Sequence, residues 1–227
     1  MYVQIFGMTR DSLREKNKLA RREKILTNAM SMIAANGERG FTLKQLAEES
    51  DVTIPTIYNL LGGREEVILT SIELALSEVD NVLTAEGPLT GVDRGLALLD
   101  SLFALLRSNK RTYKAVFRIL YELESRAVSQ AMGDLFRRTG SRFELIVKQA
   151  TNEGDLGGNL ENLPLAHNAV HSTLGAIRMW SVGSLKHEVA LARAKYAFLV
   201  ALMSDATPKG RKKMMMQLKA SEEMLNK

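Results

Sequence analysis

The sequence predicts an all-α protein, and three observations support that fold class. Apolar residues recur with the 3.6-residue period of an amphipathic helix along most of the chain, and no segment shows a sustained period-2 alternation. Residues that favour helices are plentiful, and only four of the 227 residues are proline. The composition, 45% hydrophobic and 25% charged, is that of an ordinary globular protein. We expect short helices near the N-terminus and longer ones after them.

The composition also excludes several kinds of site. The chain has no cysteine, so it forms no disulfide, thiolate nucleophile or cysteine-ligated zinc site, which suits a reducing cytoplasm. No run approaches the roughly 18 to 20 apolar residues that a membrane-spanning helix needs. The first 18 residues lack the apolar core and cleavage site of an export signal. We therefore expect a cytoplasmic protein that does not enter a membrane.

The net charge of +5 is concentrated at the two ends of the chain. Residues 10–24 contain seven Lys or Arg against three acids, and residues 208–227 contain six against two, whereas the residues outside these two segments are net acidic. A basic arm over residues 1–17, ahead of a helical unit, is what a phosphate-binding protein would use. For the basic tail over residues 206–227 a solvated, solubilising charge run is the favoured interpretation.

The first helix is expected over residues 18–36. Its inner face is apolar at positions i, i+4, i+7 and i+8, which are Ile25, Ala29, Met32 and Ile33. Gly37 follows where a left-handed C-cap is wanted.

Two short helices come next. Thr42 and Gln45 have the spacing of a capping box, in which each side chain accepts from the other residue's backbone N–H. After a break at Asp51, Thr53 can cap the following helix, and Pro55 falls in its first turn, where a missing N–H costs little. The two helices and their tight turn predict a helix-turn-helix at about residues 42–61.

The second of these helices has an apolar inner face and an outer face without charge. The inward positions are Ile57, Leu60 and Leu61, and the outward ones are Pro55, Thr56, Tyr58 and Asn59. An acidic residue on that outer face would meet phosphates if the helix entered the DNA major groove, so the uncharged face favours close approach to a polyanion.

Longer helices are expected for the remainder of the chain. They cover residues 65–85, 91–108, 110–124, 128–153, 163–182 and 186–204, with a break possible near Thr139 and Gly140 in the fourth. The tail from Pro208 has the pattern of a further amphipathic helix. We therefore divide the chain into the arm, a head at residues 18–64, a larger helical unit at residues 65–205, and the tail.

The run from Lys24 to Leu69 resembles the DNA-binding domain of the TetR family of bacterial transcriptional regulators. The positions that carry the resemblance are Ile25, Ala29, Gly37, Thr42, Leu46, Ala47, Val52, Thr53, Pro55, Thr56, Ile57, Tyr58, Arg64, Glu65 and Glu66. The remainder resembles the family in plan only, with long helices and a late segment from Gly175 to Gly183. The resemblance implies a helix-turn-helix head on a ligand-binding and dimerisation bundle.

The resemblance also implies roles for single residues. Lys44 stands where family members reach a base edge, and Thr42 stands at a helix N-terminus near a phosphate. The recognition-helix face corresponds to Thr53, Ile54, Pro55, Thr56, Tyr58 and Asn59. Arg64 replaces the lysine that usually grips the DNA backbone, and it keeps the charge.

Three positions depart from the family pattern. Leu60 and Leu61 replace a histidine or aromatic residue and a phenylalanine, so one phosphate contact is expected to be absent. Asp51 replaces a common glycine, so the aspartate either adopts the left-handed conformation of that position or the turn avoids it.

Other side chains have a structural and a functional interpretation. An i, i+4, i+8 stripe is formed by Tyr113, Phe117 and Tyr121, and core packing is favoured for it over a ligand cavity. Trp180 can likewise be a core or a pocket residue. These four are the candidate pocket residues. His167 and His171 have the spacing of a metal pair but few acids near them, so we expect packing or interface residues and no metal.

The resemblance implies a homodimer in which residues 163–204 pair across a two-fold axis. Such a dimer would be a ligand-responsive repressor that binds a palindromic operator. Its partners would be double-stranded DNA, a second copy and an unknown small-molecule effector, with no cofactor. No nucleophile and base, carboxylate pair or metal cluster indicates an enzyme. The alternative is a helical interaction module without specific DNA binding. The effector, the operator and the choice between repression and activation stay open.

Overall fold

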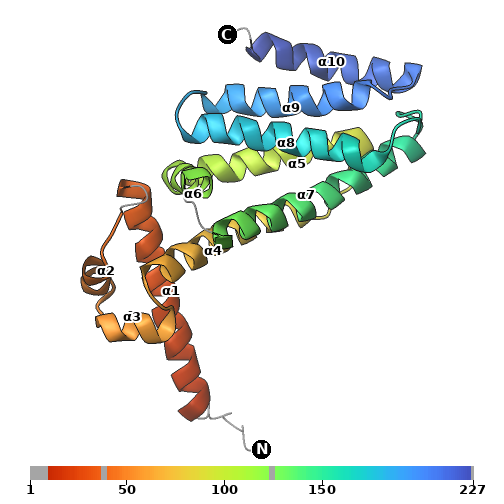
Figure 1. Ribbon diagram of the computed structural model, residues 1–227. Coiled ribbons are helices and arrows are strands. Elements are labelled where there is room, and N and C mark those ends of the chain that lie inside the picture. Colours follow the sequence, from red (N-terminus) through yellow and green to blue (C-terminus); the bar gives the residue numbers. More distant parts are fainter. Residues whose placement is uncertain (1–9, 37–39, 123–125, 226–227) are drawn as a thin grey trace, which may run out of the picture. The chain divides into compact units, whose positions relative to one another are not determined.

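The computed structural model describes residues 10–36, 40–122 and 126–225, which contain ten helices and no β-strand (Figure 1). In chain order the helices are α1 Arg10–Asn36, α2 Leu43–Ser50, α3 Ile54–Leu60, α4 Arg64–Thr84, α5 Gly91–Ser108, α6 Lys110–Glu122, α7 Arg126–Asn152, α8 Asn162–Ser181, α9 His187–Met203 and α10 Pro208–Leu225. The all-α prediction is confirmed. The expected C-cap at Gly37 lies outside the described residues.

The chain divides into two compact units, the first ending at Glu73 and the second beginning at Leu74. Helix α4 is continuous across this boundary, so it belongs to both units.

In the first unit, α1, α2 and α3 enclose a small apolar core. Ile25, Leu46 and Ile57, one from each helix, are fully buried. The Asn28 side chain donates to the backbone oxygen of Glu49 (3.0 Å) and to the hydroxyl of Ser50 (3.1 Å), both at the end of α2. Apolar burial and this polar contact hold α2 on one side of α1.

The second unit is a stack of long helices. Helix α8 packs between α7 and α9, and α10 packs on α9 (Figure 1). Helix α5 packs against both α7 and α9, and α6 packs against α8. The core between them is aliphatic and aromatic, and Trp180 is fully buried in it.

Helix boundaries differ from the sequence prediction in two places. Helix α1 begins at Arg10 instead of near residue 18, because its basic first turns consist mostly of good helix formers. Helix α7 continues through Thr139 and Gly140 without a break. A Cβ on Gly140 would lie 2.7 Å from the His167 ring, so this glycine permits close packing of α8 instead of ending the helix.

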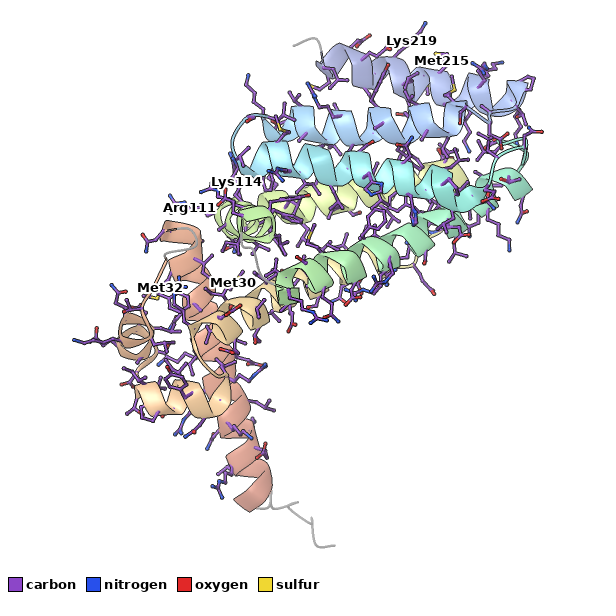
Figure 2. The ribbon with its side chains drawn as sticks, in the orientation of Figure 1. Met30, Met32, Arg111, Lys114, Met215 and Lys219 are labelled. Atoms are coloured by element: carbon purple, nitrogen blue, oxygen red, sulfur yellow. The ribbon has the colours of Figure 1, made fainter. Side chains whose placement is uncertain are left out.

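The basic tail is a helix, as its amphipathic pattern predicts, and one side of it packs on the second unit. In α10 Met214 is fully buried, and the Lys213 ammonium lies 2.8 Å from Asp155 and 3.0 Å from Asp93. A Cβ on Gly210 would lie 1.9 Å from the backbone oxygen of Asp155, so only glycine allows α10 to approach so closely. Other charges of the helix remain outside, and Lys219 points away from α9 (Figure 2).

None of the helices in the described residues is both long and apolar enough to span a membrane.

Candidate nucleic-acid interface and internal cavity

Local interactions set the start of α2 and its end at the turn into α3. The Thr42 hydroxyl accepts from the Gln45 N–H (3.2 Å), and the Gln45 side-chain oxygen accepts from the Thr42 N–H (2.9 Å), which completes the capping box expected from the sequence. Helix α2 ends at Asp51, whose φ of 55° is left-handed. The aspartate thus takes the conformation usually given to glycine, and it is one of the few residues that tolerate it.

Helix α3 begins at a second capping threonine. The Thr53 hydroxyl accepts a long hydrogen bond from the Thr56 N–H (3.4 Å) and lies 2.9 Å from the Thr56 hydroxyl. Pro55 occupies the first turn, where its missing N–H leaves no helical bond unmade. Ile57 is fully buried and anchors the helix to the first unit.

The outer face of α3 is exposed and free of acidic residues. Tyr58 is 56% exposed and Ile54 is 37% exposed, although both side chains are large and partly apolar. The exposed members of the expected DNA-binding set are Thr42, Lys44, Thr53, Ile54, Pro55, Tyr58 and Asn59, and Thr56 is half-buried. No acidic residue occurs between Val52 and Gly63. This surface therefore suits contact with a polyanion.

Arg64 makes contacts inside the first unit that the sequence did not predict. Its Nε donates to the backbone oxygen of Phe41 (3.0 Å), and its guanidinium lies 5.5 Å from the centre of the Phe41 ring. Phe41 directly precedes the capping Thr42. The arginine therefore joins the start of α4 to the start of α2.

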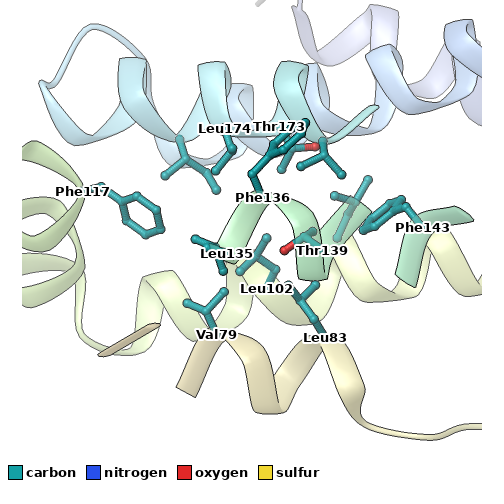
Figure 3. Close-up of a pocket in the computed structure, with 13 residues that line it drawn as sticks. Val79, Leu83, Leu102, Phe117, Leu135, Phe136, Thr139, Phe143, Thr173 and Leu174 are labelled. Atoms are coloured by element: carbon teal, nitrogen blue, oxygen red, sulfur yellow. The ribbon is translucent and has the colours of Figure 1, made fainter. Parts of the chain in front are cut away.

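A small cavity of about 30 Å³ lies in the core of the second unit, between α4, α5, α6, α7 and α8 (Figure 3). Its lining includes Val79 and Leu83 of α4 and Phe136 of α7. Thr139 of α7 and Thr173 of α8 are the two lining residues with a polar side chain, and the Thr173 hydroxyl donates to the backbone oxygen of Ala169 (2.9 Å). The cavity is therefore apolar, with room for about one or two water molecules.

Of the four expected pocket residues, Phe117 lines this cavity and the other three lie elsewhere. The Tyr113 hydroxyl donates to Glu78, and the Tyr121 hydroxyl donates to the backbone oxygen of Leu174 (3.3 Å). Burial raises the pKa of both phenols above the ordinary value. The hydroxyls of both tyrosines therefore have polar partners, and neither tyrosine lines the cavity.

Trp180 packs on a different set of side chains. Its ring lies 5.6 Å from the His187 ring, and the Lys114 ammonium lies 5.5 Å from its centre. Its indole N–H is buried and has no hydrogen-bond acceptor among the residues that the structure describes. Burial is also the main reason that the pKa of His187 is lowered. This tryptophan is thus a core residue outside the cavity.

The two histidines with metal-like spacing pack on an aromatic ring. The Phe136 ring centre lies 4.8 Å from that of His167 and 4.2 Å from that of His171. These contacts support the expected packing role.

Comparisons with known proteins identify the fold. No protein-family model and no curated protein matches this sequence. One similar solved structure is that of SmeT, the repressor of the Stenotrophomonas maltophilia multidrug efflux pump SmeDEF. The match covers 82% of this chain and 91% of the SmeT chain, with 21% identity and a TM-score of 0.64. A TetR-family transcriptional regulator from Marinobacter aquaeolei VT8 covers 88% and 98%, with 16% identity and a TM-score of 0.64.

A TetR-family regulator from Streptomyces coelicolor covers 90% of this chain and 89% of its own, with 11% identity and a TM-score of 0.61. Many of the structural neighbours over most of the chain are TetR-family transcriptional regulators, and this protein has the TetR-like fold.

Proposed function

We propose that this protein is a sequence-specific DNA-binding transcriptional regulator of the TetR family, which binds a palindromic operator as a homodimer and releases it in response to a small molecule. The observation that carries the proposal is the outer face of α3, which is exposed, acid-free and set at a well-capped helix-turn-helix. On the proposed operator Lys44, Thr56, Tyr58 and Asn59 meet base edges and phosphates in the major groove. Repression follows if the operator overlaps a promoter.

The α8–α9 face supports the proposed dimer. Three apolar side chains are exposed here: Met179 of α8 (43%), Val182 directly after α8 (48%) and Val200 of α9 (44%). Gly175 also lies on α8, and a Cβ there would meet nothing within 4 Å. In a two-fold dimer a second copy would bury these apolar side chains with the same two helices.

The internal cavity supports an apolar, uncharged effector. A charged compound would lose its hydration in this lining without gaining a counter-charge, whereas an apolar compound with one hydroxyl or carbonyl could pair with Thr139. Anything larger than one or two waters must displace side chains such as Val79 and Leu83 of α4. The effector then favours conformers in which α4 has moved, and because α4 belongs to both units, such conformers change how the head is presented to DNA.

The first test is selection of bound fragments from a genomic DNA library at about 0.15 M salt, where non-specific affinity is already weak. Enrichment of a palindrome establishes a sequence-specific dimeric regulator. Binding without sequence preference that merely fades with added salt would contradict it.

Substitutions on the face of α3 provide a matched second test. We expect Thr56→Ala and Tyr58→Phe each to weaken operator binding about 5- to 50-fold, because each removes a hydroxyl from the interface. Leu145→Ala, on an exposed α7 residue far along the chain, serves as the control and leaves affinity unchanged. If Thr56→Ala and Tyr58→Phe both bind the operator as the wild type does, the assigned face is wrong.

The alternative is a helical interaction module that does not recognise DNA. In that case the α3 face packs on a protein partner, and no fragment is enriched.

A further inference from the structure

The first half of α1 is a helix without a packed face. All twelve residues from Leu13 to Lys24 are exposed, and burial begins at Ile25. Figure 2 shows side chains projecting around these turns. A segment that buries no side chain gains little from tertiary packing, so its residue choice reflects something other than the core of the first unit.

The positive charges of this segment lie mainly on one side. Arg14, Lys18 and Arg21 are spaced by four and three residues, and the same spacing continues to Ile25 and Asn28. Ile25 is fully buried, and Asn28 bonds to the end of α2. The basic line is therefore on the side of α1 that faces α2 and the turn into α3.

Arg22 flanks this line, one helical turn after Lys18. Lys16 and Glu23 lie on the opposite side of the helix, about 160° and 140° from Lys18 at 100° per residue. The Lys18 ammonium lies 4.0 Å from Glu15, but both side chains are more than half exposed, and such pairs contribute little. The acidic residues therefore leave the basic side with a net positive charge.

We propose that Arg14, Lys18, Arg21 and Arg22, the α1 basic stripe, bind the phosphate backbone of DNA that flanks the bases contacted by α3. This inference rests on the proposed function. The stripe and the acid-free outer face of α3 are both surfaces of the first unit, and the stripe extends about 12 Å from Arg14 to Arg22 at 1.5 Å per residue. Guanidinium and ammonium groups along that length match the regularly spaced phosphates of a duplex.

The test uses the full-length protein and a duplex that carries the selected operator with long flanks. The readout is the slope of log affinity against log salt concentration, whose size falls by about 0.9 for each phosphate that the protein no longer neutralises. We expect the triple variant Arg14→Gln, Lys18→Gln, Arg21→Gln to reduce the slope by about 2 to 3 per protomer, because three phosphates lose their cation. Glutamine is a good helix former, so α1 remains helical, which circular dichroism verifies.

Lys16→Gln is the matched control for Lys18→Gln, because both remove one positive charge from within one helical turn. We expect Lys18→Gln to reduce the slope by about 1 and Lys16→Gln to leave it unchanged. Equal effects would show that only the total charge matters and would overturn the assignment to one side of α1.

Shortening the flanks separates this inference from the proposed function. We expect trimmed flanks to weaken wild-type binding and to leave the triple variant unaffected. If the triple variant retains the wild-type slope on an enriched operator, the stripe is not a DNA contact while the proposed function stands. If no operator is enriched and the wild-type protein instead binds anionic vesicles through the stripe, both proposals fail.

Discussion

The two threonines that begin α2 and α3 differ in the quality of their caps. Thr42 has both hydrogen bonds of a capping box, at 2.9 and 3.2 Å, whereas the hydroxyl of Thr53 accepts only a long bond from Thr56 and pairs with its side chain. Because α2 has only eight residues, one cap is a large part of what fixes its start. The recognition face of α3 depends on that start, since α2 positions the turn that leads into it.

We expect Thr42→Ala to lower the free energy of unfolding by about 1 kcal/mol, because the Gln45 N–H at the start of α2 loses its acceptor and the capping box is broken. Thr42→Ser keeps the hydroxyl and should restore most of that stability. Urea denaturation of the three proteins measures the difference. An unchanged midpoint for Thr42→Ala would show that the cap does not limit stability.

At the scale of elements, α10 is held by charge as well as by apolar burial. Lys213 joins three parts of the second unit, since its ammonium contacts Asp93 on α5 and Asp155 in the loop after α7. Burial raises the pKa of Asp155, but Lys213 and Lys209 outweigh it, so the pKa lies below its ordinary value. Burial lowers the pKa of Lys213, but its two carboxylate partners outweigh it, so the pKa lies above its ordinary value.

These shifts predict how the α10 contact depends on pH. The contribution of Asp155 is fully present above its ordinary pKa of 3.8 and is lost as pH falls through its lower folded value. The contribution of Lys213 is fully present below its ordinary pKa of 10.5 and is lost as pH rises through its higher folded value. The contact is therefore strongest across the neutral range.

We expect Lys213→Met to lower the free energy of unfolding by about 1.5–3 kcal/mol at pH 7, because buried Asp155 loses its best donor. The difference from wild type should shrink as pH falls below about 4 and through the lowered folded pKa of Asp155, where the wild-type carboxylate also loses its charge. Lys212→Met, an exposed neighbour on α10, is the control and should change stability little. A deficit in Lys213→Met that is the same at pH 7 and at about pH 3 would contradict an ionic contact.

At the scale of the whole molecule, the proposed regulation needs two copies of the chain, and Gly175 tests that requirement. Within the described part of one chain, a Cβ at this position meets nothing within 4 Å beyond its own helix backbone and its two chain neighbours. Gly175→Ala should therefore raise protomer stability by about 0.5–1 kcal/mol through helix propensity alone. In a dimer paired through α8 and α9, however, a long charged side chain at this position enters the interface.

We expect Gly175→Arg to raise the dimer dissociation constant at least about tenfold while the protomer stays folded, because a buried, unpaired guanidinium is costly at an interface. Gly133→Arg on α7 is the matched control, since a Cβ there approaches only the flexible end of Arg137. Sedimentation of the three proteins gives the association state. A dimer that tolerates Gly175→Arg would place the interface on another face.

Much of the candidate site follows from short-range sequence. The capping box at Thr42, the threonine before Pro55 and the buried position of Ile57 each depend on residues within one or two helical turns, and hydrogen bonding and helical period act over that distance. The sequence showed that Asp51 either adopts or avoids the left-handed conformation. It could not decide between the two, because aspartate tolerates that conformation without requiring it. Because boundaries depend on the same local signals, most of the helix ends were predicted within a few residues.

Contacts between distant segments were decided only by the tertiary structure. Nothing near Arg64 in the sequence indicates that it donates to Phe41, and nothing near Phe117 indicates that it lines the cavity while Tyr113 and Tyr121 do not. The cavity is lined by five helices, and Gly210 allows the tail helix to approach the backbone at Asp155 closely.

The sequence by itself determined the helices, their caps and the uncharged face of α3, since these depend on neighbouring residues. The cavity, the docking of α10 and the partners of Arg64 depend on how side chains far apart in the chain fill shared space, and close packing settles that only when all the helices are present.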